Sequence, residues 1–156
     1  MFKSIKKIIS GAQTGVDLAA LDFALENNIP CGGWCPKGRI NENGVIPDKY
    51  HLKETATAEY SERTEMNIKD SDGTLVIYSQ NIDKGTKLTL KRAMELQKPF
   101  YTIDLNDKAD LESFYQWLNV YKIETLNIAG PRESNSPGIY KLAYYFLEKM
   151  SFFCNQ

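Results

Sequence analysis

The sequence is poor in the residues that build disulfide frameworks and metal sites. Its 156 residues include three cysteines, an odd number, and a single histidine. Three cysteines are too few for a disulfide framework, and Cys31 and Cys35 have no pair of histidines nearby to complete a tetrahedral site. We therefore expect neither a disulfide scaffold nor a structural zinc ion.

A charge bias and a long apolar segment are also missing. Lys and Arg number 19, Asp and Glu number 20, and the net charge is -1, so no basic surface attracts polynucleotides. No apolar run approaches the ~20 residues that span a bilayer. The basic N-terminal residues lack the apolar region of a signal peptide. We expect a cytoplasmic protein with no nucleic-acid partner and no membrane partner.

What the sequence does contain is a regular alternation of strand and helix patterns. With 42% hydrophobic residues, its length fits one domain, residues 1–156, with a sizeable core. This alternation predicts an α/β fold of three layers, a mainly parallel five-stranded sheet with helices on both faces, and we favour the strand order 2-1-3-4-5. The expected strands are 5–10, 31–35, 73–78, 99–104 and 125–130, and the expected helices are 16–27, 58–70, 87–97, 111–121 and a last one from 139.

The first strand runs into a loop with glycine at both ends. In the segment IISGAQTGVD, Ile8 and Ile9 end a buried strand, and Gly11 and Gly15 flank the turn into the next helix. A helix N-terminus above a strand end suits a phosphate or another oxyanion. Neither the G-x-G-x-x-G fingerprint nor a P-loop is complete, so a tight turn without a ligand remains the alternative.

Further polar segments follow the other strands. The long loop 36–57 begins beside Trp34, Lys37 and Arg39, which offer an aromatic face and two cations, although a solvated basic loop is the simpler alternative. Asn43-Gly44 within this loop suggests a small hairpin. Because ligands of parallel α/β sheets bind beyond the carboxyl ends of the strands, these loops are expected to flank one crevice.

Five blocks of sequence resemble those of a known family. They are SGAQTGVDLAALDFAL, GGWCPKGR, AEYSERTEMNIKDSD, GTKLTL and NIAGPRESNSPGIY, and they resemble the putative molybdenum carrier family. That family is Rossmann-like and related to the lysine-decarboxylase-like "Lonely guy" proteins. The resemblance implies a single Rossmann-like domain that carries molybdenum cofactor, a molybdopterin with a phosphate and an oxo-metal centre, or that binds a nucleotide.

The resemblance also implies which residues bind the ligand. The matching positions are Gly11, Gln13, Thr14, Gly15 and Asp17 in the first loop, Trp34, Pro36, Lys37, Gly38 and Arg39 in the second, Arg63 and Asn67 on a helix, Gly85 and Thr86, and finally Gly130, Pro131, Arg132, Glu133 and Ser134. Two positions depart from the family pattern. Ala12 stands where glycine is frequent, and Lys84 precedes Gly85-Thr86 where the pattern often has Gly-Gly-Thr.

A nucleotide-processing enzyme or a nucleotide sensor is the alternative to a carrier. An enzyme similar to the Lonely guy phosphoribohydrolases would use Arg132 to hold phosphate and a carboxylate, Glu133 or Asp17, to help the base leave. However, Leu90 stands where such enzymes are expected to have a carboxylate. The single histidine, His51, lies in the long loop and is more simply a solvated side chain than a general base. We therefore favour a carrier or binding protein.

Aromatic residues of the last helix predict an oligomer. An apolar stripe of Leu142, Ala143, Phe146, Leu147 and Met150 should face the sheet, which leaves Tyr140, Tyr144, Tyr145, Phe152 and Phe153 for other sides. Aromatic residues gathered on a surface are typical of interfaces. The expectation is a homo-oligomer, most simply a two-fold dimer.

Overall fold

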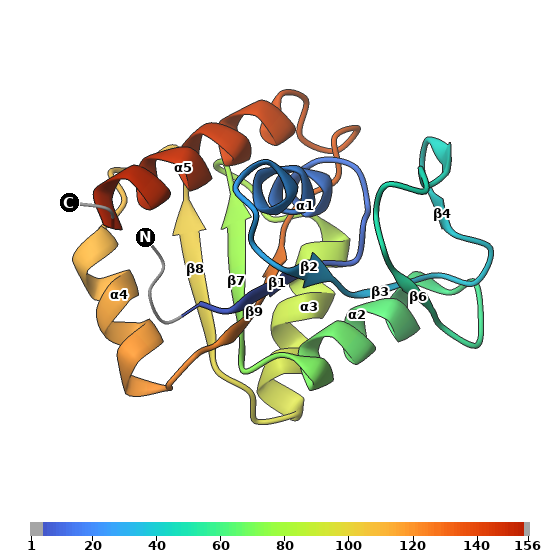
Figure 1. Cartoon of the computed structure of the whole chain (residues 1–156), viewed down its shortest axis with the longest axis horizontal. Helices are drawn as coiled ribbons and strands as arrows, with labels where there is room; N and C mark the ends of the chain where they lie inside the picture. Colours follow the sequence, from blue (N-terminus) through green and yellow to red (C-terminus); the bar gives the residue numbers. More distant parts are fainter. Residues whose placement is uncertain (1–4, 155–156) are drawn as a thin grey trace.

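Strand β7 (Gly73–Tyr78) is an inner strand of the central sheet and is buried along nearly its whole length. The computed structural model describes residues 5–154 of the chain and the side chains of residues 5–150 (Figure 1). All neighbouring strands of this sheet pair in parallel. Its order is β2-β1-β9-β7-β8, with β1 (Lys7–Ile9), β2 (Cys31–Gly32), β8 (Phe100–Asp104) and β9 (Thr125–Ala129).

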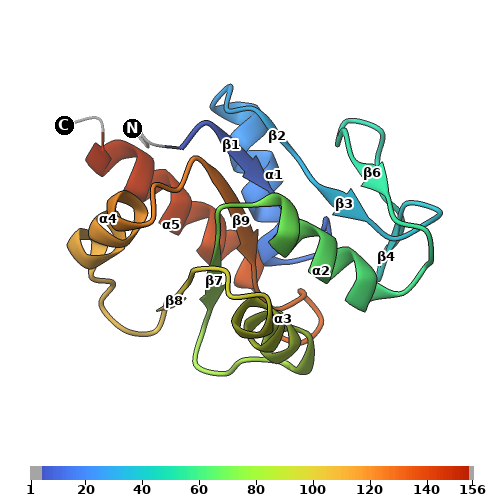
Figure 2. The ribbon, with the colours of Figure 1, turned by 90° about the horizontal axis from the view of Figure 1, so that it is seen from below.

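Helices cover both faces of this sheet. One hydrophobic core joins α1 (Val16–Glu26), α4 (Leu111–Val120) and α5 (Ile139–Cys154) to the strands. Helices α2 (Tyr60–Asp70) and α3 (Lys84–Glu95) contact each other on the opposite face (Figure 2). None of the described helices is long and apolar enough to cross a membrane. The predicted α/β class, a Rossmann-like parallel five-stranded sheet with helices on both faces, is confirmed.

The predicted strand order was wrong. The order 2-1-3-4-5 would place β7 next to β1, but the last strand, β9, lies between them and pairs with both. Its central residues, from Leu126 to Ile128, are all buried. A strand covered on both faces suits the centre of a sheet, and periodicity along the chain does not reveal which buried strand takes that place.

Two expected element boundaries also differ. The helix expected at 87–97 begins earlier, at Lys84, because the Asp83 carboxylate caps it by accepting the Thr86 N–H at 2.8 Å. The strand expected at 31–35 is divided at Gly33, since β2 pairs with β1 whereas β3 (Trp34–Cys35) pairs with β6 (Lys53–Glu54).

The long loop forms a small lobe beside α2 (Figure 1). The predicted hairpin at Asn43-Gly44 is confirmed, because β4 (Ile40–Asn41) pairs antiparallel with β5 (Gly44–Val45). A second, smaller core joins Ile46 and Tyr50 of this lobe to Leu21 of α1 and to Ala12 of the first loop. The lobe is therefore packed against the beginning of the chain, and this brings the hairpin close to the first loop.

The last helix buries a face that differs in part from the predicted one. Ala143, Phe146, Leu147 and Met150 are buried as expected, but Leu142 is 48% exposed and Ile139 is buried. The Tyr144 ring meets Phe23 of α1 edge-on at 6.3 Å. The Tyr140 hydroxyl donates to the carboxylate of Asp22, which also lies on α1. Two of the tyrosines expected at an interface are thus used within the chain, and the side chains of Phe152 and Phe153 lie outside the described residues.

The homodimer stays a prediction, supported by exposed residues that remain on α5. Leu142 and Tyr145 are 48% and 52% exposed and are three positions apart on the helix. If α5 contributes to a two-fold interface, light scattering at micromolar concentration will give a mass of about twice that of the 17.8 kDa chain. Replacing Tyr145 with Lys should then shift the mass towards that of the monomer. A mass near 17.8 kDa for the unmodified protein would refute the dimer.

Candidate anion-binding site

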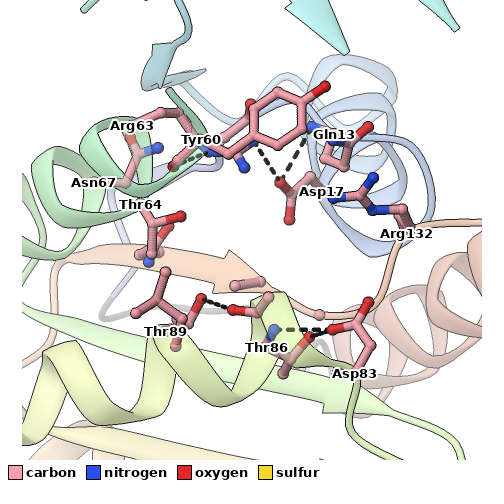
Figure 3. A pocket seen from close by; sticks show the side chains of 16 residues that line it. Gln13, Asp17, Tyr60, Arg63, Thr64, Asn67, Asp83, Thr86, Thr89 and Arg132 are labelled. Carbon is pink, nitrogen blue, oxygen red and sulfur yellow. Dashed lines mark hydrogen bonds and ion pairs between the residues drawn. The ribbon is translucent and has the colours of Figure 1, made fainter. Parts of the chain in front are cut away.

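A cavity of about 80 Å³ lies beyond the carboxyl ends of β1, β9 and β7. It has room for several water molecules or for one small polar group. Figure 3 shows that its wall combines the first loop and α1, one side of α2, the first turns of α3 and the end of β9. The lining residues are Gly11, Gln13, Asp17, Tyr60, Arg63, Thr64, Asn67, Asp83, Gly85, Thr86, Leu88, Thr89, Asn127, Ala129, Gly130 and Arg132.

The structure brings together only some of the residues predicted to bind a ligand. Those that line the cavity are Gly11, Gln13, Asp17, Arg63, Asn67, Gly85, Thr86, Gly130 and Arg132. Those that do not line it fall into two groups. Thr14, Gly15, Pro131, Glu133 and Ser134 belong to the first and last polar loops, and Trp34, Pro36, Lys37, Gly38 and Arg39 belong to the second strand and the long loop.

Arg63 forms a fixed cationic wall of the cavity. Only 8% of the residue is exposed, and its guanidinium donates to the carbonyl oxygens of Gly11 at 2.9 Å and of Tyr60 at 3.3 Å. Its Nη1 also lies 3.8 Å from the Asp17 carboxylate. Gly11 permits this approach, because a Cβ there would lie 2.2 Å from the Arg63 Cδ. Burial lowers the pKa of Arg63, an effect that the Asp17 charge opposes.

Tyr60 connects Arg63 with the second cation of the cavity. The Cζ atoms of Arg63 and Arg132 lie 5.0 Å and 5.4 Å from the centre of the Tyr60 ring, within the range of cation–π contacts. The ring therefore helps to hold two positive groups at one wall. Tyr60 is not among the residues predicted to bind the ligand. Its position one turn before Arg63 was a usable signal, but its contact with Arg132 joins distant segments of the chain.

Gln13 presents a buried donor that has no partner among the described residues. The side-chain oxygen accepts the N–H groups of Thr14 at 3.1 Å and of Glu42 at 3.0 Å, which fixes the orientation of the amide. The Nε2 atom is then left buried without a hydrogen bond, and only 5% of the residue is exposed. A buried unpaired donor costs roughly 1 to 3 kcal/mol, so a bound acceptor would relieve it.

Two carboxylates of the cavity differ in their chemistry. Burial raises the pKa of Asp17 to about 6, despite the nearby Arg63 and the Gln13 N–H that bonds to Oδ2 at 3.1 Å. Burial also acts on Asp83, but hydrogen bonds from Thr86 and Asn135 outweigh it and lower the pKa of that carboxyl. Asp83 is thus a permanent anion that caps α3, whereas Asp17 titrates close to neutral pH.

The backbone of the first loop is largely occupied by its own hydrogen bonds. The N–H groups of Ala12, Gln13 and Thr14 bond to the side chains of Ser10, Asp17 and Gln13. The Val16 N–H donates to the Pro131 carbonyl at 3.3 Å. An anion in the cavity would consequently meet the side chains of Gln13, Arg63 and Arg132, together with the N-terminal turn of α3.

The last polar loop, between β9 and α5, stabilises elements that surround the cavity. The Glu133 carboxylate accepts the N–H groups of Gly138 at 2.5 Å and of Tyr140 at 3.0 Å, so it holds the start of α5. Ser134 and Thr14 both bond to the carboxylate of Glu42, at the tip of the β4–β5 hairpin. Sequence reasoning missed Glu42, because nothing in its local pattern indicates a contact with residues 92 positions away.

The aromatic and basic cluster expected near Trp34 is not part of this cavity. The Asn67 side chain bonds to the backbone of Trp34, and the indole N–H donates to Asp70 at 2.6 Å. Arg39 donates to the carbonyl oxygens of Pro47 and Tyr50, each at 2.9 Å, and thereby organises the long loop. Lys37 is exposed, and the Gly38 N–H donates to Glu54. These residues serve the local structure of the lobe.

The parallel sheet, with helices on both faces and a charged crevice at its carboxyl edge, defines a Rossmann-like α/β domain. The model of the circularly permutated YpsA SLOG family matches residues 8–151, and the chain belongs to this family. It is 47% identical to a putative molybdenum carrier protein from Syntrophus aciditrophicus SB, whose crystal structure matches with a TM-score of 0.89 over 93% of this chain and 94% of that chain. The search of curated proteins found no match.

The strand order fits a circular permutation. If β9 and α5 preceded β1, the observed order would be 3-2-1-4-5, which is the classic dinucleotide-binding order 3-2-1-4-5-6 without its last strand. The order reverses between the first and fourth strands of that numbering, which are β9 and β7 here. The cavity lies at this position, lined by Gly130 after β9 and by Asp83 after β7.

Proposed function

We propose that the protein is a carrier that holds a phosphate-bearing ligand, molybdopterin of the molybdenum cofactor or a nucleotide, with an anionic group in the cavity. Membership of the family and the name of the Syntrophus aciditrophicus relative support a carrier. The observation that carries the proposal is the cavity wall, to which Gln13, whose buried Nε2 has no partner among the described residues, contributes together with Arg63 and Arg132. Together these groups supply one neutral and two cationic donors, which suits a phosphate oxygen cluster.

A nucleotide-processing enzyme remains the second candidate because of Asp17. A carboxyl group with a pKa of about 6, at the wall of a cavity, has the protonation behaviour of a general acid or base. Glu133, the other carboxylate considered for this role, instead holds the start of α5. Release of free base from nucleoside monophosphates, at about one per second or faster, would favour this candidate over the carrier.

Gln13→Glu tests the proposed site. The glutamate can still accept the N–H groups of Thr14 and Glu42, but it replaces the unpaired donor with a negative oxygen. We expect the affinity for inorganic phosphate and for adenosine monophosphate to fall by about thirtyfold or more, because a favourable contact becomes a repulsion. Isothermal titration calorimetry would measure the change.

Gln116→Glu is the matched control, since it adds the same charge at an exposed position of α4. This variant should bind as the unmodified protein does. Equal affinity in Gln13→Glu, or no binding of either anion by the unmodified protein, would contradict the proposed site. Mass spectrometry of the ligand retained on gently purified protein would then distinguish a pterin from a nucleotide.

A further inference from the structure

The carboxylate of Glu42 lies among groups that would suit a phosphate. It accepts hydrogen bonds from the hydroxyl of Thr14, from the backbone N–H of Ser134 at 3.2 Å and from the hydroxyl of Ser134 at 2.5 Å. The Nη1 atom of Arg132 lies 3.9 Å from its Oε2. A guanidinium, a backbone N–H and two hydroxyls form a donor set of the kind that proteins present to phosphate oxygens.

These donors are positioned independently of Glu42. The Thr14 hydroxyl accepts the backbone N–H of Glu133 at 3.1 Å, so its own proton is directed to the acceptor on the other side. Arg132 is stacked over the ring of Tyr60 at 5.4 Å. The N–H groups of Asn135 and Ser136 donate to the Arg132 carbonyl at 3.1 Å, which holds the backbone around Ser134. The Thr14 hydroxyl, the Arg132 guanidinium and the Ser134 N–H would therefore persist if the Glu42 side chain moved away.

The Glu42 subsite, defined as Thr14, Ser134 and Arg132 around the Glu42 carboxylate, adjoins the cavity. Arg132 belongs to both, because it lines the cavity and forms the ion pair with Glu42. A ligand with two neighbouring anionic groups could place one in the cavity and the other among these donors. Such a ligand would have to displace the carboxylate of Glu42.

Displacement requires little movement of the chain. The hairpin is also anchored by its backbone and by Asn41, whose amide donates to the Ala12 carbonyl at 3.0 Å, while the Glu42 N–H donates to Gln13. A change of side-chain rotamer at Glu42 leaves both bonds in place. The hairpin beyond it is open to solvent, since Val45 is 76% exposed, so a displaced carboxylate can reach water.

We propose that Glu42 is an internal occupant of a second anion subsite, and that the ligand is a diphosphate-bearing compound whose second phosphate replaces the Glu42 carboxylate. This inference rests on the proposed function, because it extends the anion site of the cavity. It assigns a binding role to Thr14 and Ser134, which do not line the cavity. It also makes Glu42 a residue that opposes binding of diphosphates and not of single phosphates.

Glu42→Ala and Glu42→Gln test the inference, with inorganic phosphate and inorganic pyrophosphate as probes in calorimetry. Removing the carboxylate should raise the affinity for pyrophosphate about tenfold or more, because alanine leaves the donors vacant and glutamine occupies them only with a neutral oxygen. The affinity for phosphate should change less than about threefold. Adding Ser134→Ala to Glu42→Ala should reverse most of the gain for pyrophosphate. Glu54→Ala, which removes an exposed carboxylate from the same lobe, should change neither affinity.

The outcomes separate this inference from the proposed function. Unchanged or weaker binding of pyrophosphate by both folded Glu42 variants, with phosphate still bound, would show that Glu42 only fastens the hairpin, and would overturn the inference alone. Absence of phosphate binding by the unmodified protein would contradict the proposed function. A gain for pyrophosphate in both variants that Ser134→Ala does not reduce would also overturn the subsite as defined.

Discussion

Replacing Gly130 with alanine is expected to destabilise the protein by about 3 kcal/mol or more. A Cβ at this position would lie 2.1 Å from the carbonyl oxygen of Ile77 and 2.6 Å from the Cγ2 of Val16. The Ile77 carbonyl belongs to the backbone of β7, and Val16 begins α1 and is fully buried. Neither can move without separating the centre of the sheet from the helix that covers it.

Gly85→Ala is the matched control, since Gly85 also lines the cavity. A Cβ there would meet only the Asp83 carboxylate, at 3.9 Å, and the position lies in the first turn of α3. Alanine should therefore be neutral or should stabilise the protein by up to about 1 kcal/mol. Urea unfolding followed by circular dichroism would measure both variants. A loss below about 1 kcal/mol for Gly130→Ala would show that the close approach of β9, β7 and α1 is not required.

The close approach of β9 to β7 and α1 matters for the cavity as well as for the core. Gly130 follows the central strand, and its small size allows the end of β9 to touch both β7 and the start of α1. The same contact places Arg132, two residues later, at the wall of the cavity opposite α3. A change that separates these elements would consequently remove the anion site as well as part of the core.

The local elements of the fold could be predicted from the sequence, but the order of the strands could not. The apolar run of β7 and the Asn43-Gly44 turn each act within a few residues, so their patterns are sufficient. The position of β9 depends on its pairing with β1 and β7. The paired residues are far apart in the sequence: Lys7 and Thr125 are separated by 118 positions, and Gly73 and Leu126 by 53. The sequence of a circularly permuted chain does not reveal the strand order of its sheet, because the strand that would come first stands last in the sequence.

The candidate site, like the fold, could be predicted only in its local features. Residues next to strand ends, such as Gly11 and Arg132, lie at the cavity as the loop pattern indicated. Glu42 and Tyr60 were missed because their roles arise from contacts between distant segments. Arg39 was expected to meet a ligand, yet its Nη2 donates to carbonyl oxygens of its own loop. Sequence reasoning identifies cations and acids readily, but it does not tell which partner each of them meets.

The charge of the cavity depends on pH because of Asp17. Arg63 and Arg132 are opposed by the permanent anion Asp83, and the remaining carboxyl group, Asp17, has a pKa of about 6. Below that value Asp17 is mostly protonated and the positive charges exceed the negative ones. Above it the cavity carries two carboxylates against two guanidiniums, so an anionic ligand is attracted less strongly.

Asp17→Asn should reveal this titration in the stability of the protein. The pKa of Asp17 is about 6 in the folded chain and 3.8 for the free group, because burial penalises the charged form. A raised pKa means that the stability contributed by protonated Asp17 is fully present below about pH 4 and is lost as the pH rises through 6. A shift of about two pH units corresponds to about 3 kcal/mol. From pH 4 to pH 7, the unmodified protein should therefore lose about 3 kcal/mol relative to Asp17→Asn.

Urea unfolding at several pH values would measure the free energies of both proteins. Asparagine keeps an oxygen that can accept the Gln13 N–H, so the variant retains the local geometry while it removes the titrating group. Asp83→Asn provides the control, because the pKa of Asp83 is lowered from its ordinary value of 3.8, so its stabilising effect is nearly fully present from pH 4 to pH 7 and is lost only at lower pH. A constant difference between the unmodified protein and Asp17→Asn over this range would show that Asp17 is ionised throughout, and that the cavity carries both carboxylates at every pH tested.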